Sequence, residues 1–359
     1  MTSRKYGRIR QWTCVSLLGL CHGFGDFNAG LLLAIIGRHS GSDIVVMYLL
    51  YNILAFVGQP FAGLICDRLG HAHRWFHFGC LLSLFSLYLV WDHPELAITC
   101  SGIASAFYHS SGGSLAWKVG DKKVLVTGLF TAPGVFGLAL GLTIAGQLSD
   151  NAFVFIGVTF FAIILILARL MSGIPILKES YNSQNSVLDT KLIGSIFGWL
   201  IILAIAARSF AWSMSQQSIF PIDYAVKLAL AAAFGKLTAS LLADRFGSLQ
   251  VSIFSLTAAA ILLAIGDHSP LWFFPAVIAL QGSTGPMMAI VLQAWPRFPA
   301  FGSGLAQGLA VAIGGAPILI LSTKTSITLY AAIGALALSG AIIFLISLSN
   351  NKRLSLQSN

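Results

Sequence analysis

Long apolar runs, separated by short polar breaks, fill almost the whole chain. One helix needs about 20 apolar residues to cross a bilayer, and most of the runs come close to that length. The pattern predicts twelve spans, at residues 12–37, 43–66, 75–91, 95–117, 123–147, 151–171, 192–215, 221–243, 248–267, 271–294, 300–323 and 326–348. The sequence therefore predicts an all-α polytopic membrane protein.

One polar break is longer than the others. Residues 172–191 contain serine, asparagine, aspartate and lysine, and they lie near the middle of the 359-residue chain. Because six predicted spans precede this break and six follow it, we expect a linker between two six-helix bundles. The bundles would comprise residues 1–171 and 192–359.

A short polar pattern between apolar runs occurs twice. Asp67 returns as Asp244 and Gly70 as Gly247, a shift of 177 residues that is about half the chain. A repeat at this spacing predicts two similar halves. In each copy glycine permits a tight reversal between helices, and the charged pair lies at the water interface. The residues of the pattern are Gly63, Asp67, Arg68 and Gly70 in the first copy and Ser240, Asp244, Arg245 and Gly247 in the second.

The repeated pattern resembles the inter-helix loop signature of the major facilitator superfamily of secondary transporters. The resemblance implies a fold of two pseudo-symmetric six-helix bundles. It also implies that the carboxylates, Asp67 and Asp244, cap and bridge neighbouring helices on the cytoplasmic side and latch one conformation. The second copy departs from the signature at Ser240, which replaces the first glycine.

Composition and charge agree with a membrane protein. Hydrophobic residues make up 57% of the chain and charged residues 9%, against about 45–50% and 25% in soluble domains. The net charge of +9 does not indicate nucleic-acid binding. With a cytoplasmic N-terminus most lysines and arginines fall on cytoplasmic segments, as the positive-inside rule requires. We expect a bacterial inner-membrane protein with both termini in the cytoplasm.

Two ionisable residues lie within the first span, four positions apart. His22 and Asp26 therefore share one helix face. A charge at that depth is costly unless it faces a polar interior, so such residues are functional candidates. We interpret Asp26 as a proton-carrying carboxylate that His22 tunes. The alternative is a structural hydrogen-bonded pair between spans.

The fourth span carries a third candidate, His109, followed by Ser110. This pair could bind substrate or relay protons, or it could make structural hydrogen bonds between helices. A hydrolase would need a G-x-S-x-G elbow and a third triad member, and the sequence offers neither. The H-x-x-x-H spacing of His73 and His77 occurs once, which favours contact with lipid headgroups over a di-iron site. We expect no enzymatic activity.

Two cations fall inside spans of the second half. Arg208 lies in the seventh span and Lys236 in the eighth, where Lys236 occupies the repeat position of Gln59. Cations that face a cavity attract an anionic substrate, and arginine can bind a phosphonate or carboxylate through two parallel hydrogen bonds. The alternative is pairing with Asp26 across the halves. We predict a substrate site made of Arg208, Lys236, Gln59 and Ser110.

The fifth span is rich in glycine. Its spacing is similar to the antiporter signature of the superfamily, although Leu142 replaces a proline and Ala145 a glycine. Regularly spaced glycines make a smooth helix face that packs tightly and flexes. Close packing without antiport would leave the same pattern. The matching residues are Gly128, Gly137, Gly141 and Gly146.

Four short segments resemble one branch of the superfamily, the fosmidomycin-resistance-type exporters. Ser110 and Ser111 stand where that branch has proline and glutamate. The matching segments are residues 22–32, 59–68, 107–109 and 208–209.

Together these observations predict a secondary transporter of a small anionic or zwitterionic compound, with proton-coupled efflux as the favoured mode. An uptake permease of the same fold and a non-transporting scaffold or sensor remain the alternatives. We expect protons, the substrate and membrane lipid as partners, and a monomer. The five cysteines form no C-x-x-C pair, so neither disulfides nor zinc are expected, and we predict no cofactor and no metal.

Overall fold

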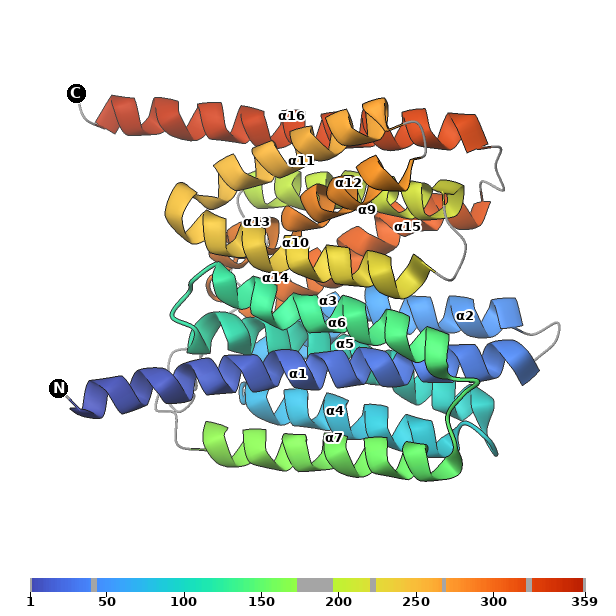
Figure 1. Cartoon of the computed structure of the whole chain (residues 1–359). Helices are drawn as coiled ribbons and strands as arrows, with labels where there is room; N and C mark the ends of the chain where they lie inside the picture. Colours follow the sequence, from blue (N-terminus) through green and yellow to red (C-terminus); the bar gives the residue numbers. More distant parts are fainter. Residues whose placement is uncertain are drawn as a thin grey trace.

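A computed structural model describes residues 2–39, 44–172, 196–219, 224–266, 269–320 and 325–357. Every regular element in these ranges is a helix. Figure 1 shows the helices running side by side, with the start of α1 and the end of α16 at the same end of the bundle. The helices of residues 2–172 lie on one side of the bundle and those of residues 196–357 on the other.

Each of the first six predicted spans corresponds to one helical rod. The second rod is continuous but contains a π-helical turn, so three elements make it up. The elements are α1 (Thr2–His39), α2 (Ile44–Asn52), η2 (Ile53–Val57), α3 (Gly58–Leu69), α4 (Ala72–Leu89), α5 (Pro94–Val119), α6 (Leu125–Ile144) and α7 (Asp150–Met171).

The second half repeats this arrangement. Its fourth rod is divided into two helices, and its fifth contains a second π-helical turn. The elements are α9 (Ile196–Ile219), α10 (Ala225–Phe246), α11 (Ser248–Ile265), α12 (Pro270–Gly282), α13 (Thr284–Ala294), α14 (Pro299–Gly304), η5 (Leu305–Leu309), α15 (Ala310–Ile320) and α16 (Thr325–Gln357).

The first and last helices are longer than their apolar runs. The first span was predicted from residue 12 and the last up to 348, whereas α1 begins at Thr2 and α16 ends at Gln357. An apolar run marks the part of a helix that lies in lipid, and the flanking polar residues contain no proline to stop the helix. Most of the predicted linker, residues 173–191, lies outside the described residues.

Nine helices among the described residues are long and apolar enough to cross a membrane. The fourth predicted span, α5, is not one of them. It is buried over most of its length, and serines and glycines rather than lipid-facing leucines occupy its central turns. Its low hydropathy therefore reflects an interior position in the bundle.

The two copies of the repeated pattern end in glycines with positive φ. Gly70 has φ 71° and Gly247 has φ 91°, a backbone region that side chains with a Cβ rarely adopt. Both turns lie at the end of the bundle where α1 begins and α16 ends. We call this end the repeat end.

Glycines bring particular helices close together. A Cβ on Gly137 or Gly141 of α6 would overlap the backbone of Gly23 or Phe27 of α1. A Cβ on Gly128 would overlap Ser240 of α10, which belongs to the other half. The first two glycines therefore tighten packing within the first half, and Gly128 lets the two halves approach each other.

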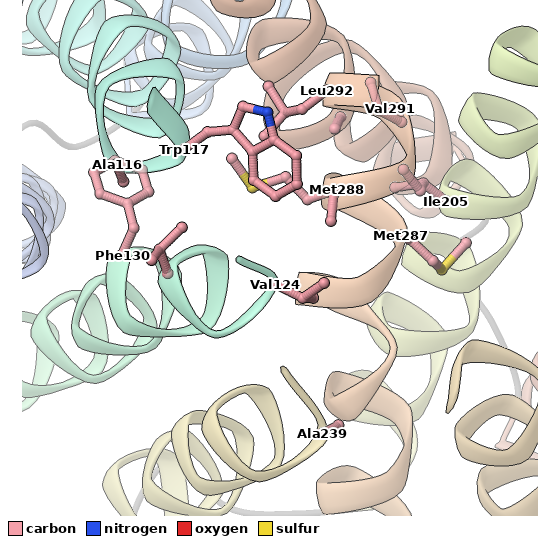
Figure 2. Packing of buried hydrophobic residues seen from close by; sticks show 14 of the residues in the cluster. Ala116, Trp117, Val124, Phe130, Ile205, Ala239, Met287, Met288, Val291 and Leu292 are labelled. Carbon is pink, nitrogen blue, oxygen red and sulfur yellow. The ribbon is translucent and has the colours of Figure 1, made fainter. Parts of the chain in front are cut away.

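Buried apolar residues also join the halves near the repeat end. Figure 2 shows Trp117 of α5 beside α13, where Met288, Val291 and Leu292 project. These side chains belong to one buried cluster, and Trp117 is 3% exposed. These contacts pack α5 of the first half against α13 of the second.

Candidate functional site

Three ionisable side chains meet inside the first half. The sequence had selected each of them as a candidate, His22 and Asp26 in α1 and His109 in α5. The two Nε2 atoms of His22 and His109 lie 2.9 Å apart. The Asp26 carboxylate lies 3.2 Å from Nε2 of His22 and 3.6 Å from Nε2 of His109. The side chain of His22 is 3% exposed and that of Asp26 13% exposed. We call these three residues the His-Asp-His triad.

Backbone carbonyls fix the orientation of both imidazoles. Nδ1 of His22 lies 2.7 Å from the carbonyl oxygen of Phe130, and Nδ1 of His109 lies 2.9 Å from that of Ser105. A carbonyl oxygen only accepts hydrogen bonds, so each Nδ1 carries the hydrogen when the ring is neutral. Each Nε2 then presents a lone pair to the other ring and to the carboxylate. This arrangement is stable only when a cation, a proton or a metal ion, lies among the three groups.

Two further residues support the triad, and sequence reasoning did not select them. Tyr108 donates a hydrogen bond to Asp26 at 2.7 Å, and its ring stacks on His109 with centroids 4.7 Å apart. Gly134 of α6 faces the triad, where a Cβ would overlap His22 and Asp26. Tyr108 directly precedes His109, so the four-residue spacing that places residues on one helix face does not select it. Ser105, whose carbonyl faces Nδ1 of His109, lies four positions before it and could have been selected by that spacing.

The triad lines a cavity of about 340 Å³ between the two halves. Arg208 of α9 and Lys236 of α10 line the same cavity from the second half. Five residues selected from the sequence therefore line one cavity: His22, Asp26, His109, Arg208 and Lys236. Neutral side chains such as Asn52, Gln281 and Gln307 complete the polar part of the lining.

The two cavity cations have few partners. Arg208 is 5% exposed; its Nη2 donates to Ser209 at 3.2 Å, and its Nε has no hydrogen-bond partner in the described residues. Lys236 donates to the carbonyl of Thr131 at 3.4 Å. Among the described residues, neither cation forms an ion pair with a carboxylate, and Asp26 pairs with His22 and His109. Pairing of either cation with Asp26, the alternative left open by the sequence, is therefore not seen.

Gln59 and Ser110 lie elsewhere. Neither is among the described residues that line the cavity. Ser110 donates to the carbonyls of Gln59 and Ala106, both at 2.7 Å, while the Gln59 amide donates to Ala55. Both side chains are fully buried. They hold α3 against α5, so we leave them out of the substrate site and give them a packing role.

The two repeated aspartates bridge the halves in a reciprocal way. Asp67, in the first half, accepts from the backbone N–H groups of Ala300 and Phe301 at 3.2 and 2.8 Å, at the start of α14. Asp244, in the second half, accepts from Val124 and Leu125 at 2.6 and 3.1 Å, at the start of α6. Carboxylates stabilise helix N-termini, where backbone N–H groups lack partners within the helix.

The remaining residues of the repeated pattern fall into two groups. A Cβ on Gly63 would overlap Ala300 and Phe301, so this glycine lets α3 touch the helix that Asp67 caps. In the second copy Ser240 replaces that glycine, and the small residue facing it is Gly128. Arg68 and Arg245 are exposed at the repeat end. Gly146, two residues past the end of α6, packs beside Arg38.

No protein-family model matches the chain, and no curated protein matches it. Solved structures do. A major facilitator superfamily transporter, FucP, in the outward conformation superposes with a TM-score of 0.72 at 13% identity, covering 93% of this chain and 97% of FucP. Two structures of a bacterial homologue of the iron transporter ferroportin, outward-facing with and without soaked iron, give 0.63 and 0.65. Their identity is 15%, with 93% of this chain and 99% of theirs covered.

The comparisons and the helical architecture define the class of protein. The chain is an all-α, multi-pass membrane protein with the major facilitator fold. The fold class expected from the apolar runs and the repeated pattern is confirmed. At sequence identities of 13–15% these matches show the fold alone. They do not show that the chain belongs to the fosmidomycin-resistance-type branch that the short segments resemble.

Proposed function

We propose that the protein is a secondary active transporter that moves a small anionic or zwitterionic compound across the bacterial inner membrane by alternating access. One observation supports this most strongly. A cavity between the two halves has a cation-demanding triad on one wall and, on the other, two cations that pair with no carboxylate among the described residues. An oppositely charged pair of subsites at mid-membrane fits the coupled transport of an ion and an anionic solute.

The proposed coupling ion is a proton. The lone pairs of His22 and His109 and the carboxylate of Asp26 converge on one small volume. A proton there turns two repelling lone pairs into a hydrogen bond and balances the buried carboxylate. Binding and release of this proton would change the charge of the cavity wall that faces the substrate.

The substrate is held by the second half in this proposal. The guanidinium of Arg208 is buried, and no described residue accepts a hydrogen bond from its Nε. An unpaired buried cation is costly, and an anionic group with two oxygens would satisfy it. Lys236 adds a second positive charge beside the same space. The cavity volume of about 340 Å³ suits a compound of metabolite size.

Alternating access would follow from contacts between the halves. The reciprocal caps of Asp67 and Asp244 hold the repeat end closed. The carbonyl of His109 also accepts hydrogen bonds from Ser303 and Gln307 of the second half, at 3.1 and 3.2 Å. These contacts tie the triad directly to the helix that Asp67 caps. With the repeat end in the cytoplasm, as the positive-inside rule predicts, this conformation is the outward-facing one.

Export is the favoured direction because α6 keeps most of the glycine spacing of the antiporter signature. Gly137 and Gly141 pack against α1, and Gly128, on the opposite side of α6, packs against α10, so glycines bring α6 close to a helix of its own half and to a helix of the other half. An uptake permease of the same fold is the second candidate. A scaffold or sensor is less well supported, since it has no need of a charged cavity between the halves.

The test is accumulation of a panel of carboxylates, phosphonates and phosphates in efflux-deficient cells that express the protein. Wild type should lower the level of at least one compound, and Asp26→Asn should abolish the pH-driven part of that effect. Lys236→Ala should weaken transport, whereas Lys227→Ala, an exposed lysine on the same helix, should not. Full pH-driven export by Asp26→Asn would contradict the coupling proposal. A higher cellular level of a panel compound with wild type would identify an importer.

A further inference from the structure

We propose that the His-Asp-His triad binds a divalent transition-metal cation, with its open coordination positions facing the cavity. Nε2 of His22, Nε2 of His109 and the Asp26 carboxylate provide one donor atom each, and these atoms all lie within 4.8 Å of one another. Metal binding by this site was not expected from the sequence, because His109 lies 87 residues from His22 and no ligand spacing rule joins them.

The spacing of the donor atoms fits a coordination sphere. With metal–ligand bonds of about 2.1 Å, neighbouring donors stand about 3.0 Å apart in an octahedron and about 3.4 Å apart in a tetrahedron. Here the two Nε2 atoms lie 2.9 Å apart, Oδ2 of Asp26 lies 3.2 Å from Nε2 of His22, and Oδ1 of Asp26 lies 3.6 Å from Nε2 of His109. One metal ion can therefore reach all three side chains with small side-chain movements.

The groups behind the donors are those that support metal ligands in proteins. A metal-binding histidine usually donates its other ring N–H to a carbonyl or carboxylate, which fixes the tautomer. Here Phe130 and Ser105 provide the carbonyls, so both Nε2 lone pairs point inward. The ligand carboxylate of Asp26 accepts a hydrogen bond from Tyr108. The lone pairs are thus oriented by the backbone of α6 and α5.

Two imidazoles and one carboxylate select a borderline metal. This donor set suits zinc, iron(II), cobalt(II) or manganese(II), and it is poor for calcium or magnesium, which prefer oxygen ligands. Three ligands leave coordination positions open, as in sites where a metal takes up an external ligand.

The cavity charges predict what fills the open positions. Lys236 and Arg208 line the same cavity and repel a bare metal ion, whereas an anion between them and the triad attracts both sides. Metal and anion should therefore bind together, each raising the affinity for the other. This second step rests on the proposed anionic substrate, while metal binding by the triad does not.

The test is titration of the purified full-length protein in detergent with Co²⁺, which takes zinc-like sites and absorbs visible light when coordinated. Wild type should bind one Co²⁺ per chain. Asp26→Asn and His109→Gln should weaken binding by at least ~100-fold, and Tyr108→Phe, which removes only a supporting hydrogen bond, by about tenfold. The control is the double variant His73→Gln/His77→Gln, which removes two histidines outside the cavity and should bind as wild type does.

Three results would overturn the metal site: no stoichiometric Co²⁺ binding by wild type, unchanged binding by His109→Gln, or loss of binding in the His73→Gln/His77→Gln control. A thermal melt of each variant identifies misfolded protein. If the ligand variants unfold, the smaller loss of Co²⁺ affinity expected for Tyr108→Phe still tests the site. Adding inorganic phosphate should tighten Co²⁺ binding in wild type and not in Arg208→Ala. Because none of these measurements involves transport, failure of the metal site and failure of proton-coupled transport are separately visible.

Discussion

Gly134 determines whether the triad has room to form. It lies on α6 beside His22 and Asp26, and a Cβ there would overlap Nε2 of the histidine and Oδ2 of the carboxylate. We predict that Gly134→Ala lowers stability by about 1–3 kcal/mol, as overpacking of a filled interior does, and abolishes transport. Thermal unfolding in detergent and the accumulation assay measure the two effects.

The matched control is Gly340→Ala. Gly340 is also in the middle of a long helix, α16, but outside its own stretch of helix no atom of the described residues lies within 4 Å of the position a Cβ would take. Because alanine favours a helix over glycine, this variant should be at least as stable as wild type and fully active. Equal behaviour of the two variants would contradict the role given to Gly134.

At the residue scale the sequence predicted which residues form the triad, but it did not predict how their side chains contact one another. His22 and Asp26 follow from helical spacing, and His109, Arg208 and Lys236 follow from the cost of burying polar groups in a membrane. Orientation of the imidazoles by the carbonyls of Phe130 and Ser105 could not be predicted, since backbone groups leave no mark in a sequence. Gln59 and Ser110 met the same burial rule but face helix neighbours rather than the cavity.

At the scale of single elements, the turn between α10 and α11 depends on one glycine. Gly247 has φ 91° and ψ 145°, where a side chain strains the backbone. We predict that Gly247→Ala destabilises the protein by about 1–3 kcal/mol, measured as a lower unfolding temperature in detergent. Gly334→Ala, at a helical glycine whose Cβ position has no neighbour from another described part of the chain, is the comparison and should show no loss.

The apolar pattern predicted where rods cross the membrane but not their internal irregularities. The π-helical turns η2 and η5 meet across the two halves, where a Cβ on Gly308 would overlap the carbonyl of Phe56. Phe56 of η2 and Gln307 of η5 both line the cavity. A π-helical turn inserts one extra residue into a helix and is frequent at functional sites. Hydropathy averages over many residues, so a one-residue insertion leaves the apolar run unchanged.

At the scale of the whole molecule, the repeated pattern predicted two halves and a latch. The structure adds which helix of the other half each aspartate contacts. Each half provides one aspartate and one helix N-terminus to the other half. A repeat in the sequence reveals that two loops are alike, but it does not reveal which partner each loop contacts. That partner depends on how the halves face each other.

Because the two caps are reciprocal, removing both should open the repeat end. Each aspartate accepts two backbone hydrogen bonds, and hydrogen bonds to a charged group contribute about 1.5–3 kcal/mol each. Asparagine keeps the shape but loses the charge, and its amide nitrogen faces one of the N–H groups. We predict that Asp67→Asn/Asp244→Asn shifts the population toward the conformation open at the repeat end by at least about tenfold.

Spin labels on Arg74→Cys and Gln250→Cys would report this shift, because both positions are exposed at the repeat end, one in each half. The native cysteine that is not buried, Cys100, is replaced by serine. The distance between labels should be longer in the double variant than in wild type, with an intermediate mixture in each single variant. Asp121→Asn, an exposed acid at the same end, should leave the distance unchanged. A distance distribution identical to wild type in the double variant would show that the apolar contacts around Trp117 and Met288 keep this end closed without the aspartates.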